Sequence, residues 1–232
     1  MQIISVNPAD TSDIVTSIQA PSVQDVVEAT RRAHQAQAAW AKVPAPARGR
    51  VIAAVGRLME ANKDSLAALV TREIGKTYAE ALGEVQEVID TCDFFLGEGR
   101  RLYGQTVPSE MPDKQLFTFR APVGTAFIIT AGNFPTAVPS WYIVPALLCG
   151  NSVVWKPAEV SPAISYAMTS IFHAGGVPED VLVTIVADGA TTSAALEQVL
   201  EERLVQKVGF TGSTAVGRAI GELTGRHLQS PC

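Results

Sequence analysis

The sequence predicts an α/β protein in which N-terminal helices precede part of a doubly wound parallel sheet. The first observation is composition: 47% of the 232 residues are hydrophobic and 18% are charged, which suits a folded core and excludes a disordered chain. The second is that apolar residues recur at helical spacing up to about residue 100. The third is that, beyond Pro122, short apolar runs alternate with helical segments, as in sheets of parallel strands covered on both faces.

The first hundred residues are predicted to be helical. Helices are expected over 22–40, 47–62, 64–75 and 77–99. Ser22, with Asp25 three residues on, forms a capping-box pattern at the first helix, and Pro44 follows its end. Gly75 suits the position after the third helix. Cys92 lies on the apolar stripe of the fourth helix, so we interpret it as a packing residue.

The rest of the chain begins with a predicted loop or arm over 104–122, which is rich in Gly, Pro and polar residues and contains one strand at 115–120. Strands are then expected over 124–130, 152–156, 181–186 and 207–210, and helices over 136–149, 161–175, 192–200 and 214–223. Ser161 and Pro162 form an N-cap and first-turn proline pattern.

Charge and cysteine content exclude several classes of partner. The net charge is −5 and no basic run occurs, so neither nucleic acid nor an anionic membrane is expected. Three cysteines without a C-x-x-C pair and three scattered histidines predict neither a disulfide framework nor a metal site. Residues 121–155 carry no charge, but their prolines and glycines favour a protein interior over a membrane span. The N-terminus is unlike a secretory signal, so we expect a cytoplasmic protein.

Ligands of parallel α/β sheets bind at the carboxyl ends of the strands, so the turns that follow the strands form the candidate site. The turn after the first strand contains Asn133, and it lacks both the G-x-G-x-x-G and the G-x-x-x-x-G-K-[ST] phosphate-binding patterns. The Asn133 amide suits the stabilisation of an oxyanion. It equally suits a structural role in its own turn, and the turn alone leaves both interpretations open.

Two further turns carry polar residues. Lys156 and Glu159 follow the second strand, where a carboxylate would accept the hydroxyls of an adenosine ribose and favour NAD over NADP. The alternative is a solvated ion pair of little energetic weight. Gly212, Ser213 and Gly217 lie where the fourth strand meets a helix, and free N–H groups there attract phosphate. The alternative is that Gly212 only permits a turn and Gly217 only a close packing contact.

Taken together and in this order, the turns resemble the aldehyde dehydrogenase superfamily. The matching segments are Asn133-Phe134-Pro135, Lys156-Pro157-Ala158-Glu159, Phe210-Thr211-Gly212-Ser213 with Val216-Gly217, and upstream Glu73-Ile74-Gly75-Lys76 and Glu80-Ala81 with Gly83-Glu84-Val85. The resemblance is collinear over nearly the whole chain and implies a Rossmann-like fold. It divides the chain into an N-terminal helical segment (1–103), the start of an oligomerisation arm (104–122) and an incomplete dinucleotide-binding domain (123–232).

The resemblance also implies a role for each matching position. Asn133 corresponds to the side-chain donor of the oxyanion hole. The cofactor, NAD with NADP as the alternative, is expected to contact Ile129, Lys156, Glu159, Gly189, Phe210, Gly212, Ser213 and Val216. Lys156 and Glu159 would hold the ribose and Ser213 the pyrophosphate. No metal is implied.

The family reaction uses two residues that this chain is expected to lack. A cysteine thiolate attacks the aldehyde, the adduct gives a hydride to NAD, and a glutamate activates the water that releases the acid. We therefore expect an N-terminal fragment that is inactive and, with an open sheet edge, marginally stable. Cys232 is not expected to be the nucleophile. The alternative is a non-catalytic module that binds NAD or pairs with other subunits.

The substrate and assembly of the complete enzyme follow only from the resemblance. Family members commonly have Pro-Trp before the asparagine, whereas this chain has Ala131-Gly132. Some branches that oxidise semialdehydes also lack the tryptophan, so a semialdehyde is the expected substrate class. The complete enzyme is expected to be a homo-oligomer, either a dimer or a tetramer.

Overall fold

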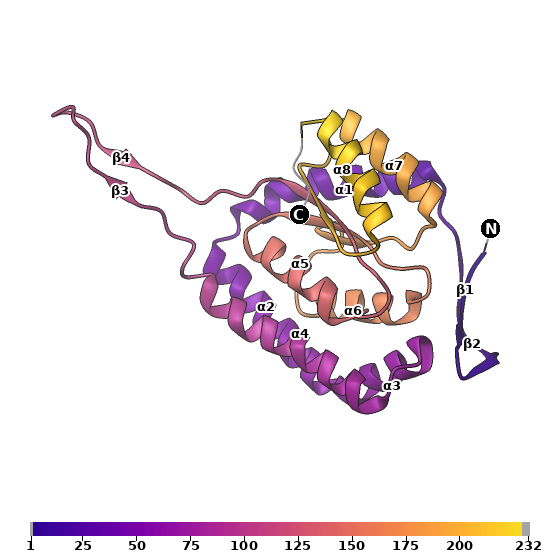
Figure 1. Ribbon diagram of the computed structural model, residues 1–232. Helices are drawn as coiled ribbons and strands as arrows, with labels where there is room; N and C mark the ends of the chain where they lie inside the picture. The colour runs from indigo at the N-terminus through magenta and orange to yellow at the C-terminus, as the bar shows by residue number, and fades with distance from the viewer. Residues whose placement is uncertain (1, 229–232) are drawn as a thin grey trace.

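The structure, a computed structural model, describes residues 2–228 (Figure 1). Its elements are β1 (Gln2–Asn7), β2 (Asp10–Gln19), α1 (Val23–Lys42), α2 (Ala45–Ala61), α3 (Lys63–Ile74), α4 (Tyr78–Glu98), β3 (Thr106–Val107), β4 (Leu116–Phe117), β5 (Thr125–Ile129), α5 (Ala137–Leu148), β6 (Ser152–Lys156), α6 (Pro162–Ala174), β7 (Leu182–Thr184), α7 (Gly189–Glu201), β8 (Lys207–Phe210) and α8 (Thr214–Arg226). Among residues 2–228, no helix is long and apolar enough to cross a membrane.

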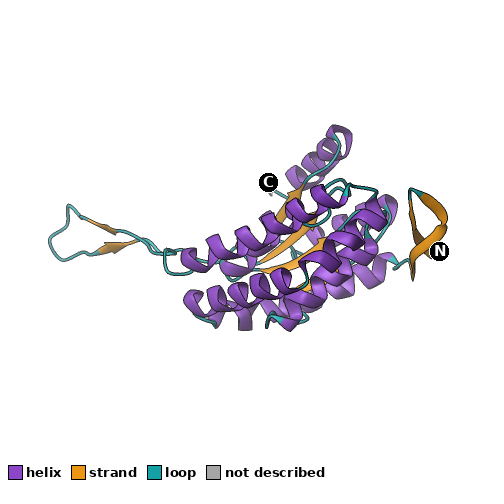
Figure 2. Ribbon diagram, turned by 90° about the horizontal axis from the view of Figure 1, so that it is seen from below, coloured by secondary structure: helices purple, strands orange, loops and turns teal. Residues whose placement is uncertain are grey.

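Strands β5 to β8 form the central sheet, with parallel neighbours in the order β7-β6-β5-β8. Successive side chains of a strand point to opposite faces. Ala126 and Ile128 of β5 therefore join a core formed with α2 to α6, whereas Phe127 and Ile129 join a second core formed with α1, α7 and α8. Figure 2 shows the strands between these helical layers. The predicted doubly wound parallel sheet is confirmed.

The predicted helical N-terminus is wrong for residues 2–19, which form the antiparallel hairpin of β1 and β2. Its side chains alternate, because Ile3 and Ser5 are buried while Ile4 is half exposed. In the turn, the Ala9 amide donates to Asn7 Oδ1 at 3.0 Å, which is the local bond typical of an Asx turn. Alternation and turn chemistry were both present in the sequence, and the helical interpretation overlooked them.

The four predicted helices are present as α1 to α4. At α1 the capping box is formed, with Ser22 Oγ accepting from the Asp25 amide and Asp25 Oδ2 accepting from the Ser22 amide. Gly75 ends α3 with φ +79°, a left-handed conformation that suits glycine. Cys92 is fully buried, and a Cβ on Gly56 of α2 would lie 2.9 Å from the Cys92 Cβ. The packing interpretation of Cys92 is therefore confirmed.

The elements of the second half differ from their predicted ranges mainly at the ends. β6 and β8 have the predicted bounds, while β7 is shorter than 181–186. α7 begins at Gly189 instead of 192, because Asp188 is its N-cap and its carboxylate accepts from the Thr191 amide at 2.7 Å. α8 continues beyond the predicted 223 to Arg226.

β3 and β4 form an arm that projects from the body of the molecule (Figures 1 and 2). The strand predicted over 115–120 is reduced to Leu116–Phe117, because its ladder extends only over the facing Thr106–Val107. Apolar side chains on the arm and its return segment remain in solvent, including Phe117 and Phe119, the latter 84% exposed.

Candidate functional site

The sheet places three of the predicted cofactor residues side by side at one edge. In the strand register Ile129, which ends β5, pairs with Lys156 of β6 and with Phe210 of β8. All three are the last residues of their strands. This is the carboxyl edge of a parallel sheet, where the ligands of such folds bind.

A cleft of about 600 Å³ opens from this edge between α7 and α8. Five predicted cofactor residues contribute to its lining: Ile129, Lys156, Glu159, Gly189 and Val216. The remaining wall is made of residues that were not predicted from the sequence: Thr192, Ser193, Leu196 and Glu197 of α7, and Ala219, Ile220, Glu222, Leu223 and Arg226 of α8. The helical spacing of Val216, Ile220 and Leu223 is the signal that could have found the α8 wall.

Lys156 and Glu159, which both line this cleft, form an ion pair with 3.1 Å between Nζ and Oε1. The lysine side chain is 9% exposed and the glutamate 40%, so the cation is sheltered while the carboxylate faces solvent. The pKa of Asp188 lies below its usual value, chiefly because its carboxylate accepts the Thr191 amide, and the charge of Lys156 adds to the lowering. Lys156 therefore has two acidic neighbours: Glu159 on the turn after β6 and Asp188 on the turn before α7.

The turn between β8 and α8 is organised around the Phe210 ring. A Cβ on Gly212 would lie 2.7 Å from this ring and one on Gly217 would lie 3.2 Å from it. Ser213 is the N-cap of α8, and its hydroxyl accepts from the Val216 amide at 3.4 Å. Three predicted cofactor residues, Phe210, Gly212 and Ser213, do not line the cleft, although they lie a few residues before Val216, which does.

Asn133 lies in the turn between β5 and α5 with an exposed side chain. Within residues 2–228 its amide group has no hydrogen-bond partner, so it does not hold its own turn together. The adjacent Gly132 packs against the turn after β6, since a Cβ there would lie 2.6 Å from Val160 Cγ2 and 3.2 Å from Ala158 Cβ. The two turns therefore touch at Gly132.

A buried glutamate of α4 fixes the start of α5, which follows the Asn133 turn. Glu84 Oε1 accepts from the amide of Thr136 at 2.7 Å, from its hydroxyl at 2.9 Å and from the Ala137 amide at 3.2 Å. Its Oε2 pairs with Lys76 Nζ at 2.5 Å. The same ammonium group lies 3.5 Å from the centroid of the Phe134 ring. The two upstream motif residues thus contact both ends of the segment 134–137.

A second buried glutamate, Glu73 of α3, accepts hydrogen bonds from the first amides of α6. Its two carboxylate oxygens accept from the amides of Ala163 and Ile164, each at 2.9 Å. Ser161 occupies the N-cap position as predicted, but its hydroxyl donates to Ala158 O and makes no cap of its own. This role of Glu73 could not be predicted from the sequence, because the donors lie about ninety residues away.

Among residues 2–228, including the candidate site, no cluster of three or more His, Cys, Asp or Glu side chains could hold a metal ion.

The sheet, its two helical layers and the cleft at the carboxyl edge define a Rossmann-like α/β domain. Residues 1–231 match the model of the aldehyde dehydrogenase family. The chain belongs to the aldehyde dehydrogenase family.

Two curated relatives illustrate the match. Aldehyde dehydrogenase family 7 member A1 of Pisum sativum is 38% identical over 228 residues, which are 97% of this chain and 44% of the relative. Alpha-ketoglutaric semialdehyde dehydrogenase of Bacillus subtilis (strain 168) is 37% identical over 216 residues, 93% of this chain and 44% of that protein. The chain therefore spans somewhat less than half the length of these relatives.

Solved structures give the same result for the fold. An E. coli NADP dependent enzyme superposes with a TM-score of 0.94 at 32% identity, over all of this chain and 47% of that one. PnpE in complex with nicotinamide adenine dinucleotide superposes with a TM-score of 0.93 at 30% identity, again over 100% and 47%. Neighbours of this fold thus include one described as NADP dependent and one solved with NAD.

Proposed function

We propose that this chain is the cofactor-binding part of an aldehyde dehydrogenase that oxidises an aldehyde to a carboxylic acid with NAD, or NADP, as acceptor. The observation that carries the proposal is the cleft at the carboxyl edge of the sheet, with the Lys156–Glu159 pair in its lining. Family membership supports it, as do the two structural neighbours, one described as NADP dependent and one solved with NAD. A bound dinucleotide would supply the hydride acceptor.

The residues of the cleft fit such a dinucleotide. Lys156 offers a donor and Glu159 an acceptor to ribose hydroxyls, and the aliphatic wall of Val216, Ile220 and Leu223 suits a planar adenine. Gly189 has open space where a Cβ would stand, so a ligand can approach the backbone at the start of α7. Ser213 and the N-terminus of α8 suit a pyrophosphate.

Asn133 is proposed as a donor to the substrate oxygen. Its exposed amide, which has no hydrogen-bond partner among residues 2–228, lies in the turn after β5, and that turn is fixed by Glu84 and Lys76. A donor held in advance at the place where negative charge develops lowers the barrier of an acyl-transfer reaction. The thiolate and the glutamate base of the reaction are proposed to lie in sequence beyond residue 232.

The substrate of the complete enzyme is proposed to be a semialdehyde. The name of the B. subtilis relative and the glycine at position 132 support this proposal. The complete enzyme is further proposed to form homo-oligomers through the projecting arm, whose exposed aromatic side chains offer apolar contact surface.

The experiment that tests the cofactor site is titration of this chain and of Glu159→Gln with NAD and NADP. The wild type should prefer NAD, because the Glu159 carboxylate accepts from the ribose and repels a 2′-phosphate. Without the charge, the ratio of the NADP to the NAD dissociation constant should fall about tenfold. Glu179→Gln, an exposed carboxylate that is not among the lining residues of the cleft, is the matched control. An unchanged ratio in Glu159→Gln would remove the ribose role.

A further inference from the structure

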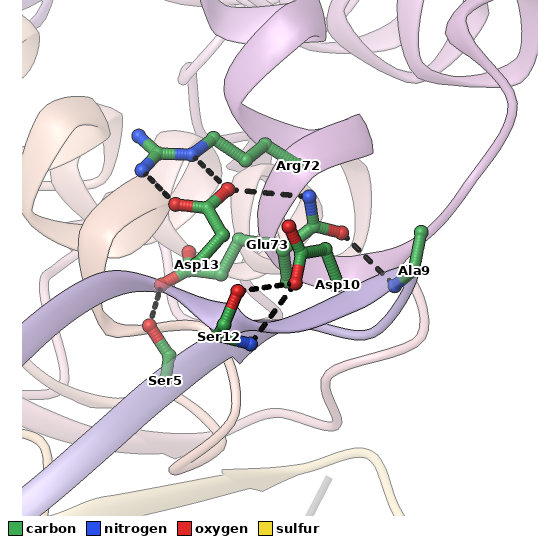
Figure 3. Close-up of polar contacts among 8 residues, drawn as sticks. Ser5, Ala9, Asp10, Ser12, Asp13, Arg72 and Glu73 are labelled. Carbon is green, nitrogen blue, oxygen red and sulfur yellow. Dashed lines mark hydrogen bonds and ion pairs between the residues drawn. The ribbon is translucent and has the colours of Figure 1, made fainter.

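Glu73 is a buried carboxyl group, 3% exposed, on the last turn of α3. It lies between two elements that are distant in sequence. Oε1 accepts from Ser5 Oγ at 2.7 Å and from the Ala163 amide at 2.9 Å, and Oε2 accepts from the Ile164 amide at 2.9 Å. Figure 3 shows Ser5 reaching Glu73 from the hairpin, beside the Arg72–Asp13 pair.

The start of α6 depends on this carboxylate. The first amides of a helix have no partner within the helix, and buried ones need an acceptor from elsewhere. Pro162 has no N–H, and the Ser161 hydroxyl donates to Ala158 O. Among residues 2–228, the side chain that accepts from the Ala163 and Ile164 amides is therefore that of Glu73. A negative charge at a helix N-terminus is also favoured by the helix dipole.

The position of α6 in turn fixes the segment that carries Glu159. Residues 157–161 connect the end of β6 to the start of α6. Lys156 is held in the sheet at one end, and its carbonyl accepts from the Thr130 amide at 3.2 Å. At the other end the Ser161 amide and hydroxyl both donate to Ala158 O at 3.1 Å. Because the 157–161 turn is short and held at both ends, its conformation depends mainly on where α6 begins.

We propose that Glu73 is a positioning residue for the cofactor site. It holds the start of α6, and with it the 157–161 turn, where Glu159 can reach a dinucleotide ribose. Ser5 orients the Glu73 carboxylate, so the N-terminal hairpin takes part in cofactor binding without touching the cofactor. The inference rests on the proposed function and deepens it, because it assigns a role to residues remote from the cleft.

The test compares Glu73→Gln and Ser5→Ala with the wild-type chain in three measurements: the NAD dissociation constant by calorimetry, amide hydrogen exchange of 157–164 and the thermal midpoint. Glu73→Gln keeps one acceptor oxygen and should bind NAD about tenfold more weakly. Its 157–164 segment should exchange faster. Ser5→Ala should change both in the same direction but less, because the two amide contacts remain.

Thr77→Ala is the matched control. Thr77 caps α4, its hydroxyl accepts from the Glu80 amide, and α4 does not follow a site turn. This variant should lower the thermal midpoint while the NAD dissociation constant and the exchange of 157–164 stay at wild-type values. If Glu73→Gln and Ser5→Ala behave like Thr77→Ala, Glu73 is only a structural cap and the inference is overturned. If the wild-type chain binds neither NAD nor NADP, the proposed function itself fails first, and the inference with it.

Discussion

Glu84 places a charged side chain, 1% exposed, between α4 and the start of α5. Each oxygen has partners of opposite polarity: Lys76 on one side, and the Thr136 and Ala137 groups on the other. An ion is tolerated in a protein interior only when its hydrogen-bonding capacity is met in this way. The residue therefore couples the stability of the fold to the geometry of the Asn133 turn.

Replacing Glu84 by alanine should lower the free energy of unfolding by about 3–5 kcal/mol, because the Lys76 ammonium group and the amides of Thr136 and Ala137 lose their partner. Urea unfolding measures the change. Glu87→Ala, an exposed glutamate one turn further along the same helix, should stay within about 0.5 kcal/mol of wild type. Equal losses in the two variants would show that burial of Glu84 does not matter.

At the scale of elements, the N-terminal hairpin is attached to α3 by two adjacent residues. Glu73 receives the Ser5 hydroxyl, and Arg72 forms a bidentate pair with Asp13, with Nε at 2.9 Å from Oδ2 and Nη2 at 2.5 Å from Oδ1 (Figure 3). The Arg72 guanidinium, helped by Asn7, lowers the pKa of Asp13 from 3.8 to about 2. The attachment therefore has one buried and one solvent-facing component.

Docking of the hairpin should depend on pH through Asp13. Because the pKa of Asp13 is lower in the folded state, the pair stabilises the docked hairpin fully above pH 3.8, and this contribution is lost as the pH falls toward 2. Amide exchange of residues 2–19 measured between pH 5 and pH 2 should show increasing opening. In Asp13→Asn the hairpin should open more at pH 5, and the difference from wild type should shrink steadily as the pH falls to 2. A wild-type profile parallel to that of Asp13→Asn contradicts the assignment.

The same elements show which features a sequence can predict. The Ser22–Asp25 capping box and the Gly75 helix end were predictable because every group involved lies within one helical turn. The hairpin was locally encoded but outweighed by the helical pattern of the residues after it. The caps of α5 and α6 were not predictable, because Glu84 and Glu73 give no local sign of donors in another layer. In the site, the positions of Lys156 and Glu159 after a strand were enough to predict that they lie at the carboxyl edge of the sheet. The α7 residues of the cleft could be identified only from the packed structure.

At the scale of the whole molecule, the described cysteines lie away from the site. Cys92 is fully buried between α4 and α2, and burial raises the pKa of its thiol to about 12. Cys149 follows the last residue of α5, at the opposite end of that helix from the Asn133 turn. Burial raises the pKa of Cys149 too, more than Arg48 and Arg120 lower it. A protonated thiol is a poor nucleophile. Cys232 lies outside the described residues.

The chain alone should therefore form no NADH from aldehydes and NAD, a result that absorbance measurements over a panel of aldehydes can check. The positive control is the same assay on a protein in which the coding sequence continues past residue 232. Turnover by the 232-residue chain that disappears in Cys149→Ser, but not in Cys92→Ser, would show that a cysteine inside this segment reacts. That result would overturn the proposal that the reactive thiolate lies in sequence beyond residue 232.

The long-range caps of α5 and α6 also set an order of events during folding. Glu84 meets Thr136 across 52 positions of the chain, and Glu73 meets Ala163 across 90. Helices α3 and α4 consist of local contacts, which form early, whereas loops of this size must close before either cap exists. During synthesis α3 and α4 leave the ribosome before the strands of the sheet have been made. The β5–β8 pairing, which joins Ala126 to Lys207, closes a loop of similar size, so the sheet and the turns at its carboxyl edge are expected to acquire their final geometry after the N-terminal helices. Kinetic traps in refolding should therefore leave those helices formed and the cleft unfinished.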